Sequence, residues 1–438
     1  MWRSEHDREI ARLAVPALGA LVAEPLYVLA DTAVVGHLGT DPLAGLAAAA
    51  SILLTAHALC TFLAYGTTAA VARLLGAGRH RDAAADAVQG VWLALLLGVV
   101  LAVVLWVTAP ALLSLLGAEG EVATQGETYL RLSLPGLPAL LVVLAGSGYL
   151  RGRQDVQTTF VVALGAALLN LVLELVLIYG FDQGIGASAL STVVAQLAAA
   201  GVYLWVIGGA ARALDVRLRP DPVALRRLLV VAGALVVRTS ALRGALVLAT
   251  AVAARIGSAE LAAHQVAFEV WSTLALALDA LAIAAQAMIG RRLGAGDAAG
   301  AAAAGRRLLV LGAAAGVATG AAVGLVRPVL PELFSDDPAV TGLTATLLVF
   351  VAVLQPVNGL VFVLDGLLIG AGDLRFLAGA MVGAGAVFVV GAGLVLATDA
   401  GLRWLWVALA VFMLARLTPL AVRWAGGRWA VVGAIRTS

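Results

Sequence analysis

The sequence predicts an all-α integral membrane protein with about twelve transmembrane helices, arranged as two six-helix repeats in parallel orientation around a central cleft. Of its 438 residues 62% are hydrophobic and 12% are charged, and the mean hydropathy is +1.02. Apolar runs of roughly 20 residues or more, each long enough to cross a hydrocarbon core as a helix, recur along the chain. Segments of the two halves also match at one constant offset, which predicts a repeat.

The apolar runs define the expected spans in chain order. They cover residues 12–36, 43–72, 86–109, 128–149, 157–180, 186–208, 227–254, 262–290, 306–327, 343–370, 375–397 and 402–424. Pro16 and Pro25 in the first span remove backbone hydrogen bonds and favour bends, as do Pro135 and Pro138 in the fourth. These spans leave no room for a large soluble domain.

The arginines orient the spans. All 28 basic residues are arginines, and 21 of them lie at the termini or in alternate connections, against four in the opposite connections. Cytoplasmic connections of membrane proteins carry the excess of basic residues. We therefore expect a multi-pass protein of the plasma (inner) membrane with both termini in the cytoplasm and an N-terminus that is retained.

The internal repeat sets the expected domain organisation. RLLGAG at 73 matches RRLGAG at 291, and GYLRGRQD at 148 matches GLLIGAGD at 366, both at a separation of 218 residues. HLGTDPLAGL at 37 resembles RIGSAELAAH at 255 at the same separation. This offset predicts an N-lobe of residues 1–207, a basic cytoplasmic linker at 208–227 and a C-lobe of residues 228–438.

Polar residues within the spans break the repeat and are the first candidates for a functional site. The offset pairs Asp31 with Ala249 and Glu174 with Ala392, so each carboxylate occurs in one half only. The same is true of Asn170, Asp279 and Asp365. Polar groups in apolar helices face the bundle interior or an aqueous cavity rather than lipid.

An isolated carboxylate at membrane depth is costly to keep charged, so it takes up a proton or pairs with a cation. Asn170 and Glu174 lie one helical turn apart and share a face. We expect Asp31, Asn170 and Glu174, with a hydroxyl oxygen from Thr192, to bind H⁺ or Na⁺. The alternative is that some of these groups only form hydrogen bonds between helices.

The second half carries charges of both signs within its spans. Arg238 and Arg243 lie in span 227–254, and Glu269 in the next span is expected to neutralise one of them, as an ion pair between adjacent helices. Together with Asp279 and Asp365, the two arginines are candidates for the substrate cleft or for secondary coupling.

Other classes of site lack their signatures. A single cysteine, Cys60, allows no intrachain disulfide, and no cluster of metal ligands is visible beyond the possible Na⁺ site. No GxxxxGK[ST] motif and no activated nucleophile occurs in the sequence, so we expect no nucleotide site, no cofactor, no nucleic-acid partner and no enzyme activity. A cleft enclosed by one chain in the lipid bilayer is compatible with a monomer.

Several segments together resemble the multidrug and toxic compound extrusion (MATE) transporters, particularly their DinF-like branch. They are PLYVLADTAVVGHLGTDPLAGLA from Pro25, NLVLELVLIYG from Asn170, LAAHQVAFEVW from Leu261 and VLDGLLIGAGD from Val363. The resemblance covers essentially the whole chain. It implies a secondary active multidrug efflux transporter that exports organic cations and other amphipathic compounds by alternating access, in exchange for H⁺ or Na⁺.

The same resemblance assigns roles to individual residues. Asp31, Asn170 and Glu174 match the branch's ion-coupling residues, although Glu174 stands where Asp is usual. Tyr129 and Thr192 resemble its tyrosine and threonine in spans 128–149 and 186–208. Two further matches are Pro16, to an early proline of the first helix, and Asp365, to the coupling aspartate of the NorM-like branch.

The alternative function is a flippase of lipid-linked precursors on a related two-lobe scaffold. A flippase of this kind needs a strongly basic cavity for pyrophosphate. Only Arg238 and Arg243 lie well inside the spans expected to line the cleft, whereas the carboxylates there favour cations. The sequence therefore favours export of cations.

Overall fold

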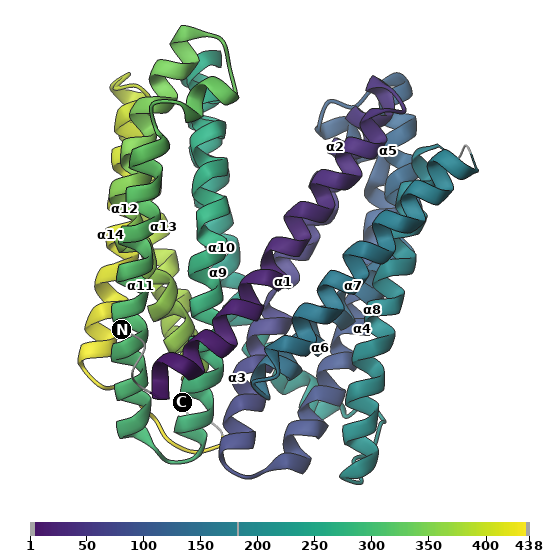
Figure 1. Cartoon of the computed structure of the whole chain (residues 1–438), viewed down its shortest axis with the longest axis vertical. Helices are drawn as coiled ribbons and strands as arrows, with labels where there is room; N and C mark the ends of the chain where they lie inside the picture. The colour runs from purple at the N-terminus through teal and green to yellow at the C-terminus, as the bar shows by residue number, and fades with distance from the viewer. Residues whose placement is uncertain (1–4, 182–183, 435–438) are drawn as a thin grey trace. The chain divides into compact units, whose positions relative to one another are not determined.

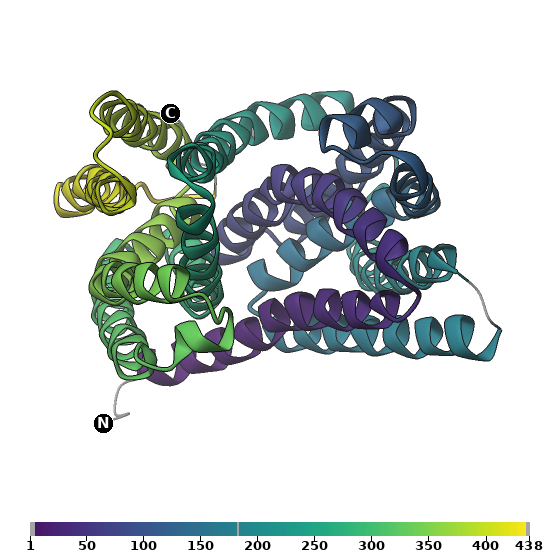
Figure 2. The same ribbon diagram turned by 90° about the horizontal axis from the view of Figure 1, so that it is seen from above.

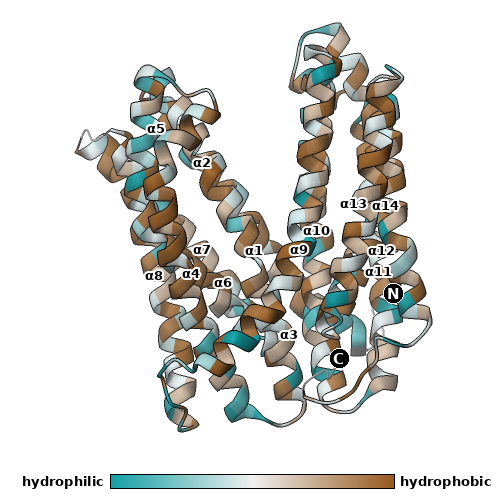
Figure 3. Ribbon diagram, turned by 180° about the vertical axis from the view of Figure 1, so that it is seen from behind, coloured by the Kyte–Doolittle hydropathy of each residue, from teal (hydrophilic) through white to brown (hydrophobic). Residues whose placement is uncertain are grey.

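The computed structural model describes residues 5–181 and 184–434, and within these ranges every regular element is helical (Figure 1). Twelve stretches of the described chain are long and apolar enough to cross a membrane, which confirms the predicted number of spans. Hydrophobic residues run along these helices, and many of the hydrophilic residues gather toward their ends (Figure 3). Arg3 and Arg436, which contribute to the predicted orientation, lie outside the described residues.

One compact unit runs from Val15 to Ala232. Its helices are α1 (Glu5–Gly36), α2 (Thr40–Cys60), α3 (Phe62–Gly76), α4 (His80–Leu115), α5 (Gly120–Ser133), α6 (Leu137–Gly152), α7 (Val156–Leu175), α8 (Ile185–Ala213) and the start of α9 (Pro222–Ile256). Thr61 separates α2 from α3 within one predicted span. A 3₁₀ turn at Leu134–Gly136 separates α5 from α6, where Pro135 removes a backbone donor as expected.

The second unit contains Gly233 onward and the start of α1 up to Ala14. Its further helices are α10 (Ser258–Gly294), α11 (Ala298–Val326), α12 (Pro338–Gly370), α13 (Leu374–Ala397) and α14 (Leu402–Ala425). Helices α13 and α14 lie side by side when the molecule is viewed from above (Figure 2). The predicted boundaries at 207 and 228 differ from this division, whose second boundary falls within α9.

The start of α1 is held to the second unit by ion pairs. Arg307 of α11 donates two hydrogen bonds to the Asp7 carboxylate, at 2.6 and 3.0 Å. Arg292 of α10 donates to Glu9 at 3.0 Å. These charges explain why the first residues of α1 group with helices that lie far away in the sequence.

The sequence repeat reappears in the helix ends. Helices α3 and α10 end at Gly76 and Gly294, 218 residues apart, and α6 and α12 end at Gly152 and Gly370 with the same separation. Gln154 and Gly372 follow the second pair with positive φ values of 64° and 69°. Both units therefore use the same left-handed turn, although only one of them has the glycine that favours it.

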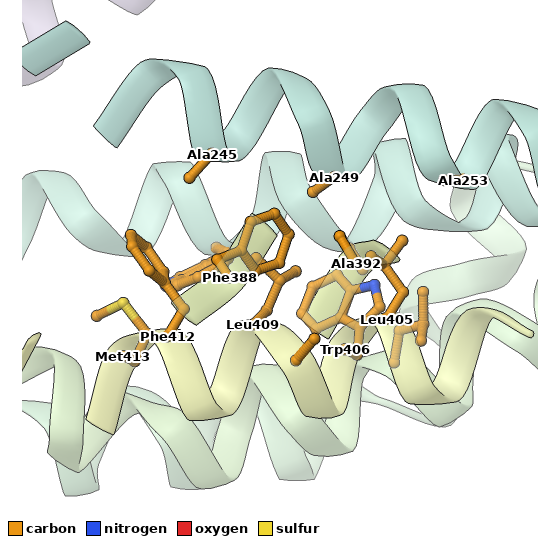
Figure 4. Close-up of a cluster of buried hydrophobic side chains, with 14 of the residues drawn as sticks. Ala245, Ala249, Ala253, Phe388, Ala392, Leu405, Trp406, Leu409, Phe412 and Met413 are labelled. Atoms are coloured by element: carbon orange, nitrogen blue, oxygen red, sulfur yellow. The ribbon is translucent and has the colours of Figure 1, made fainter. Parts of the chain in front are cut away.

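Aromatic side chains fill the core of the second unit (Figure 4). Phe388 of α13 and Phe412 of α14 pack with ring centroids 5.8 Å apart, and Trp406 is fully buried beside them. The facing positions of α9 are small, with Ala245 and Ala249 both buried. Small residues let helices approach closely in a membrane, where packing rather than the hydrophobic effect drives association.

A stripe of glycines joins α11 to α12. A Cβ atom at Gly312 would meet the backbone of Gly359, and one at Gly316 would meet the carbonyl group of Gln355 and the Cα atom of Pro356. By contrast, a Cβ atom at Gly324, farther along α11, would have no neighbour within 4 Å. The close approach of these two backbones therefore depends on particular glycines.

Gly316→Leu is expected to destabilise the protein by about 1–3 kcal/mol, because the new side chain forces backbone atoms apart. The thermal unfolding midpoint of the purified protein in detergent measures this effect. Gly324→Leu is the matched control, with the same substitution on the same helix, and should leave the midpoint unchanged. Equal midpoints for the two variants would contradict tight α11–α12 packing.

Candidate functional site

Asp31 on α1 and Glu174 on α7 are two buried carboxylates of the first unit, with 5% and 0% of their surface exposed. The Ser188 hydroxyl of α8 donates a hydrogen bond to Oδ1 of Asp31. The Glu174 carboxylate lies against Asp31 and Ser188. Neither of its oxygens, however, receives a hydrogen bond from a described residue. The two acids are thus neighbours in a region that offers them few donors.

Other polar groups near these acids donate their hydrogen atoms to other acceptors. Asn170 Nδ2 lies 3.3 Å from Ser191 Oγ and 3.1 Å from Thr192 Oγ1. Both hydroxyls donate in turn to the carbonyl oxygen of Ser188, at 2.8 and 3.0 Å. The other end of this amide, Asn170 Oδ1, accepts no hydrogen bond from the described groups.

Two tyrosines complete the cluster. The Tyr27 hydroxyl lies 2.8 Å from Thr192 Oγ1, and because Thr192 uses its own hydrogen on Ser188, Tyr27 is the donor. Tyr129 of α5 is 4% exposed, and its hydroxyl lies near Asp31, Ser188 and Thr192. The structure therefore brings together the five predicted residues Asp31, Tyr129, Asn170, Glu174 and Thr192.

This cluster has more acceptors than donors. Both Glu174 oxygens and Asn170 Oδ1 are buried acceptors that lack a partner among the described side chains. Burying such groups is unfavourable unless something satisfies them. A proton shared by Asp31 and Glu174 makes one carboxyl a donor, and a hard cation such as Na⁺ prefers oxygen ligands of this kind. The cluster is suited to exchange one small cation.

The backbone of α7 changes its helical geometry close to Glu174. Two residues after Glu174 the helix changes to a π-helical turn, Val176–Gly180. Such turns are rare and frequently lie at functional sites, because they redirect the side chains that precede and follow them. Nothing in the apolar run LVLELVLIYG predicts this change of register.

The second unit holds a different polar cluster. Asp365 of α12 accepts hydrogen bonds from Arg238 of α9 at 2.5 Å and from Arg416 of α14 at 2.9 Å. The exposed fractions of these side chains are 8%, 10% and 5%, so the charges are buried together. Glu269, the partner expected for one of the arginines of α9, is exposed. The ion pair therefore joins helices that are distant in sequence rather than adjacent.

The remaining predicted residues lie outside these two clusters. Arg243 is exposed on α9 and forms no ion pair among the described residues, and Asp279 is half-buried on α10. Pro16 lies within α1, which continues as one helix from Glu5 to Gly36. Its predicted bend stays a prediction.

Sequence reasoning missed three members of the clusters. Tyr27 lies one turn before Asp31, so helical spacing places it on a face already marked as polar, and Ser191 directly precedes Thr192. Arg416 interrupts the apolar span 402–424, where a charge is expensive unless it is paired. These positions could therefore have been singled out from the sequence alone.

The family model described as MatE matches residues 16–176 and 242–394. Protein DETOXIFICATION 44, chloroplastic, of Arabidopsis thaliana is 32% identical over 95% of this chain and 81% of its own length. DNA damage-inducible protein F of Escherichia coli is 28% identical over 97% of this chain and 94% of its own. An outward-facing multidrug resistance MATE transporter of the MOP superfamily superposes with a TM-score of 0.85 at 22% identity, covering 98% of this chain and 97% of that one.

Proposed function

The chain belongs to the MATE family of multidrug and toxic compound extrusion transporters, and from that membership we propose that it exports amphipathic or cationic compounds in exchange for H⁺ or Na⁺ by alternating access. Members of this family are transporters rather than enzymes. The coupling ion and the substrate class are the parts of this proposal that need an experiment.

One observation carries the proposal: two adjacent buried carboxylates with an excess of acceptor oxygens around them. Asp31 and Glu174 cannot both stay charged at membrane depth without a cation. A bound proton or Na⁺ removes one negative charge from the cluster. When the ion leaves, the cluster is negative and attracts a positively charged substrate. Binding of ion and substrate is therefore mutually exclusive, which is the thermodynamic requirement for exchange.

Individual residues take different parts in this exchange. Asp31 and Glu174 carry the change of charge, and the unpaired Asn170 Oδ1 supplies a neutral oxygen to a bound cation. Thr192, whose hydroxyl is already fully hydrogen-bonded, orients the Asn170 amide beside that cation. Ser188 holds Asp31 in place by a hydrogen bond, and the Tyr129 hydroxyl lies near the same carboxylate. Asp365 is held by two arginines, and this pairing favours an architectural role for it over a second coupling site.

The membrane and the oligomeric state are part of this proposal, and the charge of the connections supports the orientation. We place the protein in the plasma (inner) membrane as a monomer, with both termini on the cytoplasmic side where the arginines are concentrated. Two plant relatives carry the word chloroplastic in their names, and membrane fractionation tests the proposed location.

Ethidium efflux from proteoliposomes tests the function. The purified protein is reconstituted, ethidium is loaded, and an inward pH gradient or an inward Na⁺ gradient is imposed separately. Efflux driven by the pH gradient alone identifies H⁺ as the coupling ion, and efflux driven by Na⁺ alone identifies sodium. Protein-free liposomes give the background. No efflux above this background under either gradient, for ethidium and for other organic cations, would contradict cation export and favour a flippase.

A further inference from the structure

A groove of about 550 Å³ lies in the first unit where α3 and α6 end, α4 begins and α8 approaches its end. Its volume falls within the range of roughly 300–1,000 Å³ that is typical of ligand pockets. The ends of these helices carry the arginines that orient the spans, among them Arg73, Arg79 and Arg151. The groove is separate from the carboxylate cluster, with which it shares no lining residue.

One end of the groove is cationic. The Arg153 guanidinium lies 5.5 Å from the ring centroid of Tyr149 and is exposed. It pairs with no carboxylate within the described part of the chain, and His80 is a second basic residue on the wall. No acidic residue is found among the described residues that line the groove. A cation–π contact with Tyr149 leaves the hydrogen-bond donors of the guanidinium available to an anion.

The other wall is apolar. Trp205 of α8 is 72% exposed and lies beside Val206 and Leu75. It precedes the end of α8 at Ala213 by eight residues, or about 12 Å along the helix axis. Tryptophan at this depth is typical of the boundary between acyl chains and headgroups. An exposed apolar wall on a spanning helix faces lipid rather than water.

The repeat shows that the scaffold does not require the cationic end. The offset of 218 residues pairs Tyr149 with Leu367 and Arg153 with Ala371, although the two helices end at equivalent glycines. The second unit thus builds the same helix end and turn from apolar residues. Tyr149 and Arg153 are additions to the first unit.

We propose that this groove binds one anionic phospholipid, with the phosphate at Arg153 and an acyl chain along Trp205 and Val206. A lipid satisfies both ends at once, because it joins an anion to a hydrocarbon chain at the depth where the groove opens. A free phosphate ion would contact only the cationic end. Basic pockets between helices at the membrane surface are suited to anionic headgroups.

Native mass spectrometry of the full chain tests this assignment, with dioleoyl-phosphatidylglycerol and dioleoyl-phosphatidylcholine as probes in detergent. Wild type is expected to retain one phosphatidylglycerol more tightly than any phosphatidylcholine. Arg153→Gln should weaken that binding about fivefold, the usual contribution of one arginine at an anionic surface. Arg153→Lys should restore part of it, since the charge is kept without the planar stacking. Trp205→Ala should weaken both lipids by removing the acyl-chain contact.

Arg375→Gln is the matched control, since Arg375 is an exposed arginine at the start of α13 and outside the groove. It should bind phosphatidylglycerol as wild type does. Equal binding of the two lipids by wild type, or equal loss in Arg153→Gln and Arg375→Gln, would overturn the proposal. Displacement of phosphatidylglycerol by millimolar inorganic phosphate would show that the site recognises a free anion, and would overturn the lipid assignment.

Discussion

Asp31→Asn is expected to abolish ion-coupled efflux, reducing ethidium transport to the background of protein-free liposomes, while membrane abundance stays close to that of wild type. Asn keeps an acceptor oxygen for the hydroxyl of Ser188, so the hydrogen bond that orients the side chain survives. It cannot bind or release a proton, and it lowers the negative charge available to a cation beside Glu174. The exchange then loses the group whose charge changes.

The pH dependence of substrate binding gives this prediction a second readout. A cationic substrate competes with protons for the two carboxylates, so wild-type affinity for tetraphenylphosphonium should rise as pH rises. In Asp31→Asn that dependence should flatten, because one of the two carboxylates is gone. Glu174→Gln should behave in the same way. A merely structural role of Asp31 would lower the amount of folded protein and leave the slope of the remaining binding unchanged.

Asp41→Asn is the matched control for this test. Asp41 is an exposed acid in the first turn of α2, in the same unit, and makes the same change of charge on substitution. Its efflux and its pH dependence should equal those of wild type. Coupled efflux that persists in a folded Asp31→Asn protein would refute the assignment of Asp31 as a coupling group.

The spans and the repeat were predictable because each depends on a local property of the sequence. Length and apolarity suffice to define a spanning helix, and prolines mark the break between α5 and α6 at Pro135. The break at Thr61 between α2 and α3 was not predictable, since the surrounding run TAHALCTFLAYG contains no proline. Hydropathy and proline positions, the two patterns that defined the spans, do not mark this break.

The members of the candidate site were predictable, but several of their contacts were not. Helical spacing and the broken repeat singled out Asp31, Glu174 and Asp365 as unusual. Spacing gives the face of a helix and says nothing of which helix that face meets. Glu269 on the next helix was therefore expected to neutralise Arg238 or Arg243, whereas Arg238 pairs with Asp365 on α12. The acids of the first unit were grouped from the cost of burying each carboxylate, and the family resemblance then matched the same residues.

The division into units also depends on contacts between helices that the sequence pattern does not give. The basic connection 208–227 was the natural place to separate two repeats, because it is the most polar segment between spans. Side chains of α4 hold much of it in place: Gln89 contacts the backbone of Arg219 and Asp221, and Trp92 donates to Leu218 at 2.8 Å. A polar connection fastened in this way belongs to the first unit, and the boundary moves into α9.

Asp365→Asn is expected to have the opposite phenotype to Asp31→Asn, with loss of folded protein. The substitution removes the carboxylate that accepts from both Arg238 and Arg416 and leaves those guanidinium groups buried beside a neutral amide. Breaking a buried ion pair by removing one partner destabilises proteins by about 3–5 kcal/mol. The thermal midpoint in detergent and the abundance in membranes should both fall, and Asp336→Asn, an exposed acid in the turn before α12, should change neither.

A double substitution separates this architectural role from coupling. Arg416→Met alone should be milder than Asp365→Asn, because the pair between Arg238 and Asp365 remains. Adding Arg416→Met to Asp365→Asn should recover part of the lost stability, since it removes one of the two stranded charges. A coupling role for Asp365 predicts instead a stable, inactive single variant and no recovery in the double variant. The sign of the interaction energy in this cycle therefore decides what the second buried acid does.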